Sequence, residues 1–178
     1  MNHVVLIYRD DEEFAGRVSN FLREAMESDG LAVLIATPAH SALVQARLAR
    51  SGTDVFAAAV GGRYLVIDAK EMLRRCTVAG WPDPGRFWRV MSPLVGHDAE
   101  AGRPVRVSGD MVRLFWEAGM YSEALELEAR WADLAARYPF KLMCGYPASS
   151  APGDPRAAAL AKVLGLHAIA APAARNNE

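Results

Sequence analysis

Several features that would quickly assign a sequence to a functional class are scarce or missing here. Cysteine is rare, because Cys76 and Cys144 are too few for a disulfide framework or a four-ligand zinc site. The charge is nearly balanced, with 20 basic and 21 acidic residues, so the basic surplus needed for non-specific binding to nucleic acid is absent. No stretch comes close to a membrane-spanning helix, which needs about 18 uncharged apolar residues, and the first residues lack the pattern of a secretory signal sequence. We therefore expect a cytoplasmic protein with neither nucleic acid nor a membrane as its partner.

What the sequence does contain is the pattern of one well-packed domain. It has 178 residues, of which 52% are hydrophobic, and this is enough to bury a core. Apolar runs alternate with stretches of helical spacing, which predicts an α/β fold of three layers, with a mostly parallel central sheet and helices on both of its faces. Buried strands are predicted for residues 3–8, 32–36, 104–107 and 140–146. Two more extended runs, 54–60 and 63–67, flank Gly61-Gly62 and predict one β-hairpin.

Helix starts and segment boundaries can also be predicted. We expect an α/β core over residues 1–146, a linker loop over 147–155, a helix over 156–170 that packs on the core, and a flexible tail over 171–178. Side chains that can cap helices are Asp10 or Asp11, Thr37 before Pro38, Asp68, Asp83, Asp110 and Ser122.

The carboxyl ends of parallel strands are where such sheets bind ligands. The loops at those ends contribute our first candidate ligand-binding residues, which we expect to surround a common cleft. They are Tyr8, Arg9, His40, Asp68 and Arg106.

Catalytic motifs are missing from these loops. The loop at 37–41 lies where a phosphate loop would be, but it lacks the glycines and the lysine that hold phosphates, so we expect no ATP hydrolysis. Asp68 follows an apolar run as the acid of a Walker B strand would, yet Glu71 three residues later favours a simple helix cap. Ser41 has no hydrolase elbow around it, and His3, His40, His97 and His167 lack metal-ligand spacing. We therefore expect no enzyme activity, no metal and no cofactor, and keep His40 as a binding candidate for its loop position.

Glu128 is the most unusual residue of the chain. Helical spacing places its carboxylate on an apolar face together with Leu127 and Trp131. A buried carboxylate needs a partner, and the first candidate is Arg106, with Arg113 as the other. The alternative is that Glu128 is a polar anchor in a ligand pocket, where Trp131 would line an apolar cavity. Both residues therefore join the candidate ligand-binding set.

The order of these motifs resembles the MEDS domain, the sensory domain named after methanogens, methylotrophs and the dichloromethane-responsive regulator DcmR. The resemblance implies a fold similar to that of the RecA/KaiC P-loop NTPases with the phosphate loop lost, and it covers roughly residues 3–170. The motifs that carry it are, in chain order, His3 and Tyr8, the acidic helix start at 11–13, Phe21-Leu22, Gly30-Leu31, the segments 48–55, 62–73 and 105–111, Glu128, and 142–146.

The resemblance also implies a role. Members of this family are sensory modules proposed to bind small molecules such as hydrocarbon derivatives, often together with histidine kinases or anti-sigma-type regulators. No output domain fits after residue 150, so we expect the signal to pass to a separate partner protein. The leading hypothesis is thus a non-enzymatic sensory domain that binds a small, largely apolar organic molecule. Assembly into a homo-oligomer is compatible with this hypothesis. Two alternatives remain: a RecA-like nucleotide-binding protein with residual ATP affinity, and a ligand-free protein-interaction module.

Overall fold

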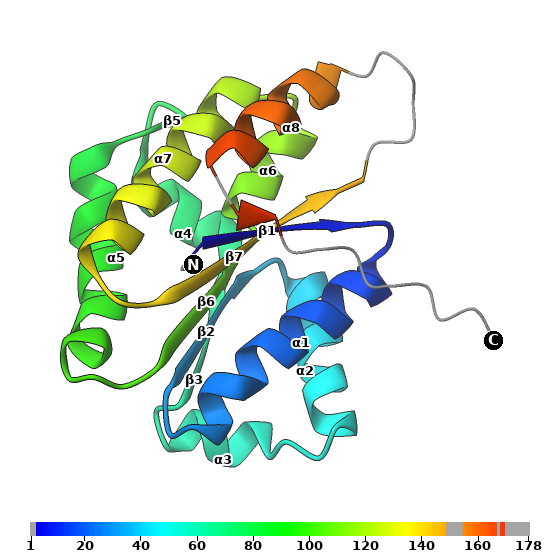
Figure 1. Ribbon diagram of the computed structural model, residues 1–178, viewed down its shortest axis with the longest axis vertical. Helices are drawn as coiled ribbons and strands as arrows, with labels where there is room; N and C mark the ends of the chain where they lie inside the picture. The colour runs from blue at the N-terminus through cyan, green and yellow to red at the C-terminus, as the bar shows by residue number, and fades with distance from the viewer. Residues whose placement is uncertain (1–2, 149–154, 167, 170–178) are drawn as a thin grey trace.

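The computed structural model describes residues 3–148, 155–166 and 168–169 (Figure 1). Its centre is a six-stranded sheet in the order β3-β2-β6-β7-β1-β8, in which every neighbouring pair is parallel. This confirms the predicted α/β fold with a parallel sheet. The strands are β1 (His3–Tyr8), β2 (Leu31–Ala36), β3 (Tyr64–Asp68), β6 (Val105–Gly109), β7 (Lys141–Pro147) and β8 (Ala168–Ile169).

Helices cover both faces of the sheet, as the three-layer prediction requires (Figure 1). One layer consists of α1 (Asp11–Glu27), α2 (Pro38–Arg50) and α3 (Val55–Val60). The other consists of α4 (Ala69–Cys76), α5 (Pro84–Glu100), α6 (Met111–Glu117), α7 (Tyr121–Arg137) and α8 (Pro155–Leu166). Residues 149–154 of the predicted linker and the predicted tail at 171–178 lie outside the described residues.

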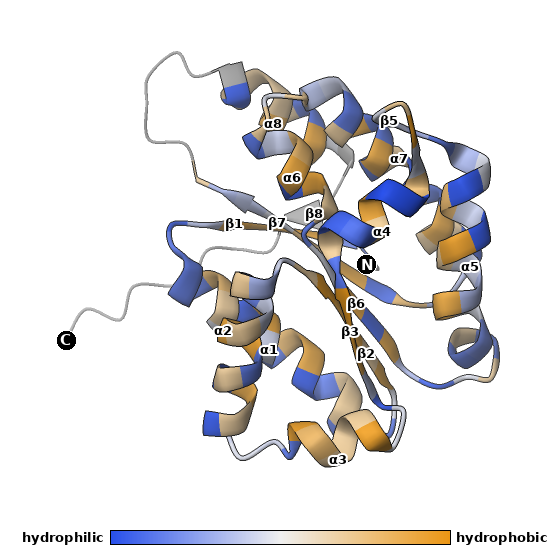
Figure 2. Ribbon diagram, turned by 180° about the vertical axis from the view of Figure 1, so that it is seen from behind, coloured by the Kyte–Doolittle hydropathy of each residue, from blue (hydrophilic) through white to orange (hydrophobic). Residues whose placement is uncertain are grey.

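The strands supply two separate hydrophobic cores because their side chains alternate between the faces. In β2, Val33 and Ile35 belong to the core under α4–α8, whereas Ala32 and Leu34 belong to the core under α1 and α2. All six residues of β2 are buried and apolar (Figure 2). Such a strand leaves no room for a polar side chain, so polar groups gather at the strand ends.

Most of the predicted helix caps are confirmed. The side chains of Asp10, Thr37, Asp68 and Asp83 each accept a hydrogen bond from the backbone N–H three residues later. For Asp68 the bond comes from Glu71 N at 2.8 Å. Asp110 occupies the predicted cap position of α6 but makes no capping bond, because its carboxylate has other partners. The cap predicted at Ser122 is wrong: α7 begins at Tyr121, and Met120 is at the cap position.

The hairpin predicted for residues 54–67 is wrong in its position. Val55–Val60 is helix α3, because Asp54 caps it through Ala57 N at 2.8 Å and a run of alanines follows. Among the described residues, the antiparallel pair is instead formed by β4 (Thr77–Val78) and β5 (Trp81–Pro82). Ala79 and Gly80 join them, and both have the positive φ, 49° and 83°, that a tight hairpin turn needs.

Gly30 is the position where the chain can carry no side chain. A Cβ atom at Gly30 would lie 2.1 Å from the carbonyl oxygen of Pro104 and 3.0 Å from that of Ala25. We expect Gly30→Ala to lower the free energy of unfolding by about 3 kcal/mol or more, since backbone atoms must move. Gly16→Ala, inside α1, is the control: its nearest neighbour is an Arg47 side-chain atom at 3.6 Å, so it should be neutral or stabilising. Urea unfolding of both variants tests this, and equal stabilities would contradict it.

Candidate functional site

Asp110 is the centre of a buried polar network at the carboxyl end of the sheet. It follows β6 and is 1% exposed, and its Oδ2 accepts hydrogen bonds from His40 Nδ1 at 2.8 Å and from Thr37 N at 3.3 Å. The Nε atom of Arg113 lies 3.5 Å from the other carboxylate oxygen. On its far side, His40 Nε2 lies 3.2 Å from Asp11 Oδ1. The network therefore ties together the first turns of α1, α2 and α6.

The electrostatics of this network favour a protonated His40. Carboxylates only accept hydrogen bonds, so both ring nitrogens must carry a proton to satisfy Asp110 and Asp11 together. Burial lowers the pKa of His40, but the hydrogen bond and the negative charge of Asp110 outweigh it, and the net pKa is raised above the ordinary 6.5. The ring also stacks on Phe14, with 4.1 Å between ring centroids.

The structure brings only part of the predicted cleft together. Tyr8 lies edge-on to His40, with ring centroids 6.2 Å apart, and both lie at the carboxyl end of the sheet. Arg9 is adjacent but exposed, where its Nε pairs with Glu13 at 2.9 Å. Asp68 is at the same end, but it lies exposed on the edge strand β3, where it caps α4.

Arg106 does not belong to this end of the sheet. It pairs in register with Ala32 near the start of β2, so it lies at the amino end. There its guanidinium pairs with Glu24 and lies 4.9 Å from the centre of the Phe21 ring. With Glu24 and Phe140 it lines a cleft of about 350 Å³. The expectation that Arg106 shares a cleft with His40 is therefore wrong, because Arg106 is the second residue of β6 and lies far from the carboxyl end of the strand.

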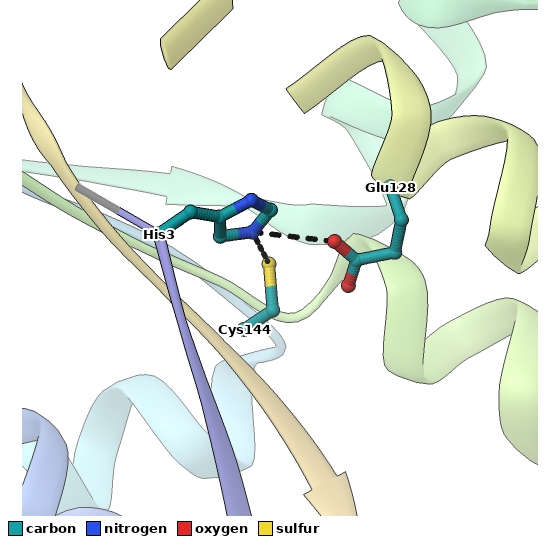
Figure 3. Close-up of side chains that lie close together, drawn as sticks. All are labelled: His3, Glu128 and Cys144. Atoms are coloured by element: carbon teal, nitrogen blue, oxygen red, sulfur yellow. Dashed lines mark hydrogen bonds and ion pairs between the residues drawn. The ribbon is translucent and has the colours of Figure 1, made fainter. Parts of the chain in front are cut away.

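Glu128 is the centre of a second buried cluster, on the other side of the sheet. Its side chain is fully buried on α7, as the helical spacing predicted. The hydroxyl of Tyr146 donates a hydrogen bond to Glu128 Oε1, and His3 Nε2 lies 3.2 Å from Oε2. The same His3 nitrogen lies 3.4 Å from Cys144 Sγ (Figure 3). Three titratable side chains from β1 and β7 thus converge on one carboxylate.

The predicted partner of Glu128 is wrong. Arg106 alternates along β6 with Val105 and Val107, which face the core under α5–α7, so its own side chain faces α1. Glu128 lies on the opposite face of the sheet. The second candidate, Arg113, is part of the Asp110 network and also pairs with Glu117.

Burial governs the chemistry of the Glu128 cluster. It raises the pKa of the Cys144 thiol well above its usual range, and the charge of Glu128 adds to this effect. The pKa of Tyr146 is raised for the same reasons. Both groups are therefore protonated donors at neutral pH. The remaining candidate, Trp131, packs in the adjacent core with its ring at right angles to Phe87, at a centroid distance of 5.1 Å.

An apolar groove between α4 and α6 is the feature that the sequence did not reveal. Its volume is about 280 Å³, and its lining comes from two helices and the β4–β5 hairpin. Helical spacing marks such residues as apolar, but it cannot tell a groove wall from a packed core. The lining residues are Lys70, Leu73, Arg74, Thr77, Gly80, Leu114 and Phe115.

A comparison with protein-family models supports the family resemblance inferred from the order of motifs along the chain. A family model described as "MEDS: MEthanogen/methylotroph, DcmR Sensory domain" matches residues 2–168. A search of curated proteins gave no match. None of the helices formed by the described residues is long and apolar enough to cross a membrane.

The raised pKa of His40 predicts how stability depends on pH. Protonated His40 contributes stability that is fully present below about pH 6.5 and is lost as the pH rises through its folded pKa. We expect the gap in unfolding free energy between the wild type and His40→Gln to shrink as the pH rises above about 6.5. In Asp110→Asn the His40 pKa, followed by NMR, should fall, because burial then acts without the buried carboxylate. A gap that widens with pH would contradict this.

The burial of Glu128 predicts a large cost for its removal. Glu128→Ala removes the carboxylate that Tyr146 and His3 contact, and it leaves a cavity. We therefore expect a loss of roughly 3–5 kcal/mol in unfolding free energy. Glu126→Ala on the same helix is the matched control. Glu126 is only half-buried, and its ion pair with Arg130 at 3.1 Å is of the kind that contributes about 0–1 kcal/mol. Denaturant unfolding that gives equal, small losses would show that Glu128 is solvated.

Proposed function

This chain belongs to the MEDS family of sensory domains, and from that premise we propose that it is a non-enzymatic sensor whose α4–α6 groove binds a small, largely apolar molecule. The single observation that carries the proposal is the groove itself. Its volume of about 280 Å³ lies just below the usual range for drug-sized ligands, which suits a smaller molecule.

The lining of the groove indicates which chemistry it would accept. Leu73, Leu114 and Phe115 supply apolar walls, so shape and hydrophobic contact would dominate binding. Lys70 and Arg74 offer their hydrocarbon stems to the groove, while long side chains of this kind keep their charged ends in water. A ligand with an apolar body and one polar end would satisfy both parts. This description fits short hydrocarbon derivatives.

The position of the groove suggests how binding could be signalled. Thr77 and Gly80 line it and belong to the β4–β5 hairpin and its turn. The same hairpin carries Val78 and Trp81, whose side chains are 46% and 48% exposed. Exposed apolar side chains beside a ligand groove are suited to contact with another protein. We propose that the ligand acts on the hairpin and that a separate partner, of the histidine-kinase or anti-sigma-regulator class, binds there.

The carboxyl end of β2 argues against a nucleotide as the ligand. The loop before α2 holds Pro38 at the first helical position and no glycine, so few backbone N–H groups point outward. The N–H of Thr37 in this loop already donates to Asp110 Oδ2 at 3.3 Å, so it is not available to a phosphate. These observations support a sensor of small organic molecules over a protein with residual ATP affinity.

Filling the groove with a larger side chain should weaken ligand binding. In wild-type protein we expect saturable NMR shifts of the backbone amides of Leu73, Gly80 and Leu114 on titration with dichloromethane, 1-butanol or toluene. Leu114→Trp should weaken this binding at least tenfold, about 1.4 kcal/mol, because the indole occupies the groove. Leu43→Trp is the control, since Leu43 is also half-buried on a helix but lies on the opposite side of the sheet.

Two results would contradict the proposal. One is an absence of saturable shifts with every one of these probes in folded wild-type protein. The other is a set of shifts produced by Mg-ATP around Thr37 and Asp110 that exceeds anything the organic probes produce.

A further inference from the structure

We propose that His3, Glu128 and Cys144 form a binding site for a divalent transition-metal ion of the zinc class. The three side chains offer one nitrogen, one oxygen and one sulfur atom, and all these atoms lie within 4.8 Å of one another. They come from β1, α7 and β7 and point toward a common centre (Figure 3). Imidazole, carboxylate and thiolate are the three kinds of ligand that zinc accepts in proteins.

The two distances from His3 to the other ligand atoms fit this assignment, and the third lies within 4.8 Å. Two ligands of a tetrahedral zinc ion, with bonds of about 2.0–2.3 Å, lie about 3.3–3.6 Å apart. His3 Nε2 lies 3.2 Å from Glu128 Oε2 and 3.4 Å from Cys144 Sγ. Small side-chain movements are therefore enough to place an ion between the three groups.

The scaffold holds the ligands in place. In β1, His3 lies two residues before Val5, which pairs with Cys144 across the parallel ladder, so both side chains project from the same face of the sheet. Glu128 approaches from α7 above that face. The fixed register of two paired strands and the packing of one helix thus preorganise the site, as a metal centre requires.

Charge balance is a second argument for a divalent ion. The cluster lies in the apolar core, with Glu128 and Cys144 both fully buried. One carboxylate and one thiolate together carry two negative charges, and these neutralise a divalent cation while the imidazole stays neutral. A coordinated thiol loses its proton even where burial alone would keep it protonated. With the metal bound, the buried negative charge of Glu128 would become part of an electrically neutral site.

Tyr146 completes the arrangement as a positioning residue. Its hydroxyl donates to Glu128 Oε1, which leaves Oε2 directed toward His3. The phenol ring is itself held against Trp116, with centroids 4.9 Å apart. Partners of this kind orient the ligands of protein metal sites. Three protein ligands leave a fourth position, as in zinc sites that exchange a water or another small ligand.

Cobalt(II) reports the proposed site directly, because it replaces zinc and gives visible bands in tetrahedral sites and a charge-transfer band with thiolate. After treatment with EDTA, the full-length chain should bind one equivalent of Co²⁺ with both signals, and Zn²⁺ should displace it. Cys144→Ser should abolish the thiolate band. Cys76→Ser is the matched control: Cys76 is the other cysteine of the chain and equally buried, but it lies on α4 outside the cluster, so the band should remain.

A second pair of variants keeps the test independent of core packing. His3 is the most exposed of the three ligands, at 8%, and His3→Gln should weaken cobalt binding at least 100-fold while the protein stays folded. Tyr146→Phe should weaken it about 10–100-fold and keep the thiolate band, as expected of a positioning residue. The proposal is overturned if folded wild-type protein gives no thiolate band, if the band survives in Cys144→Ser, or if His3→Gln binds cobalt as tightly as the wild type.

Discussion

Burial of the central strands on both faces is the constraint from which the rest of this structure follows. Because β2 is buried at every residue, the helices of both layers must cover it and no charge can lie along it. The charged side chains that are buried therefore occupy the ends of strands or the inner faces of helices. Burying each of these charges destabilises the fold unless neighbouring groups compensate the charge. In the described residues these charged groups are His40, Asp110, Arg113 and Glu128.

The two buried polar sites meet this cost in different ways. The carboxylate of Asp110 has a backbone N–H, an imidazole that favours its protonated form and a guanidinium around it, so its negative charge is compensated, although Asp110 Oδ1 and Arg113 Nε form an ion pair without a hydrogen bond. This explains why the network serves to join helix starts. Glu128 faces an imidazole and a thiol, whose protons a metal ion can replace, and a phenol that donates a hydrogen bond to its other oxygen. The first arrangement stabilises the fold, and the second has the chemistry of a site.

Local signals in the sequence predicted the fold well, but they could not predict contacts across the sheet. Asp68 was correctly assigned as a cap because the bond it accepts from Glu71 N is set within four residues. Gly61-Gly62 predicted a turn, yet it could not show that a helix precedes it and a parallel strand follows. The burial of Glu128 followed from helical phase. The partner of Glu128 could not be predicted from helical phase. The alternation of Arg106 with Val105 and Val107 along β6, however, already placed Arg106 on the face of the sheet opposite to those two valines. His3 and Cys144, 141 residues apart, meet only through strand register.

The proposed groove and the proposed metal site lie on two sides of the same helix. Leu114 and Phe115 of α6 line the groove, and the next residue, Trp116, packs on the ring of Tyr146. Tyr146 in turn donates its hydrogen bond to Glu128. Because these side chains are buried and closely packed, a ligand that displaced α6 would press Trp116 on Tyr146 and so move the carboxylate that faces His3. Such coupling is reciprocal: the factor by which a groove ligand changes the affinity for the ion equals the factor by which the ion, by fixing Glu128, changes the affinity for the groove ligand. Through Trp116 and Tyr146, α6 is thus the element that connects the proposed groove to the proposed metal site.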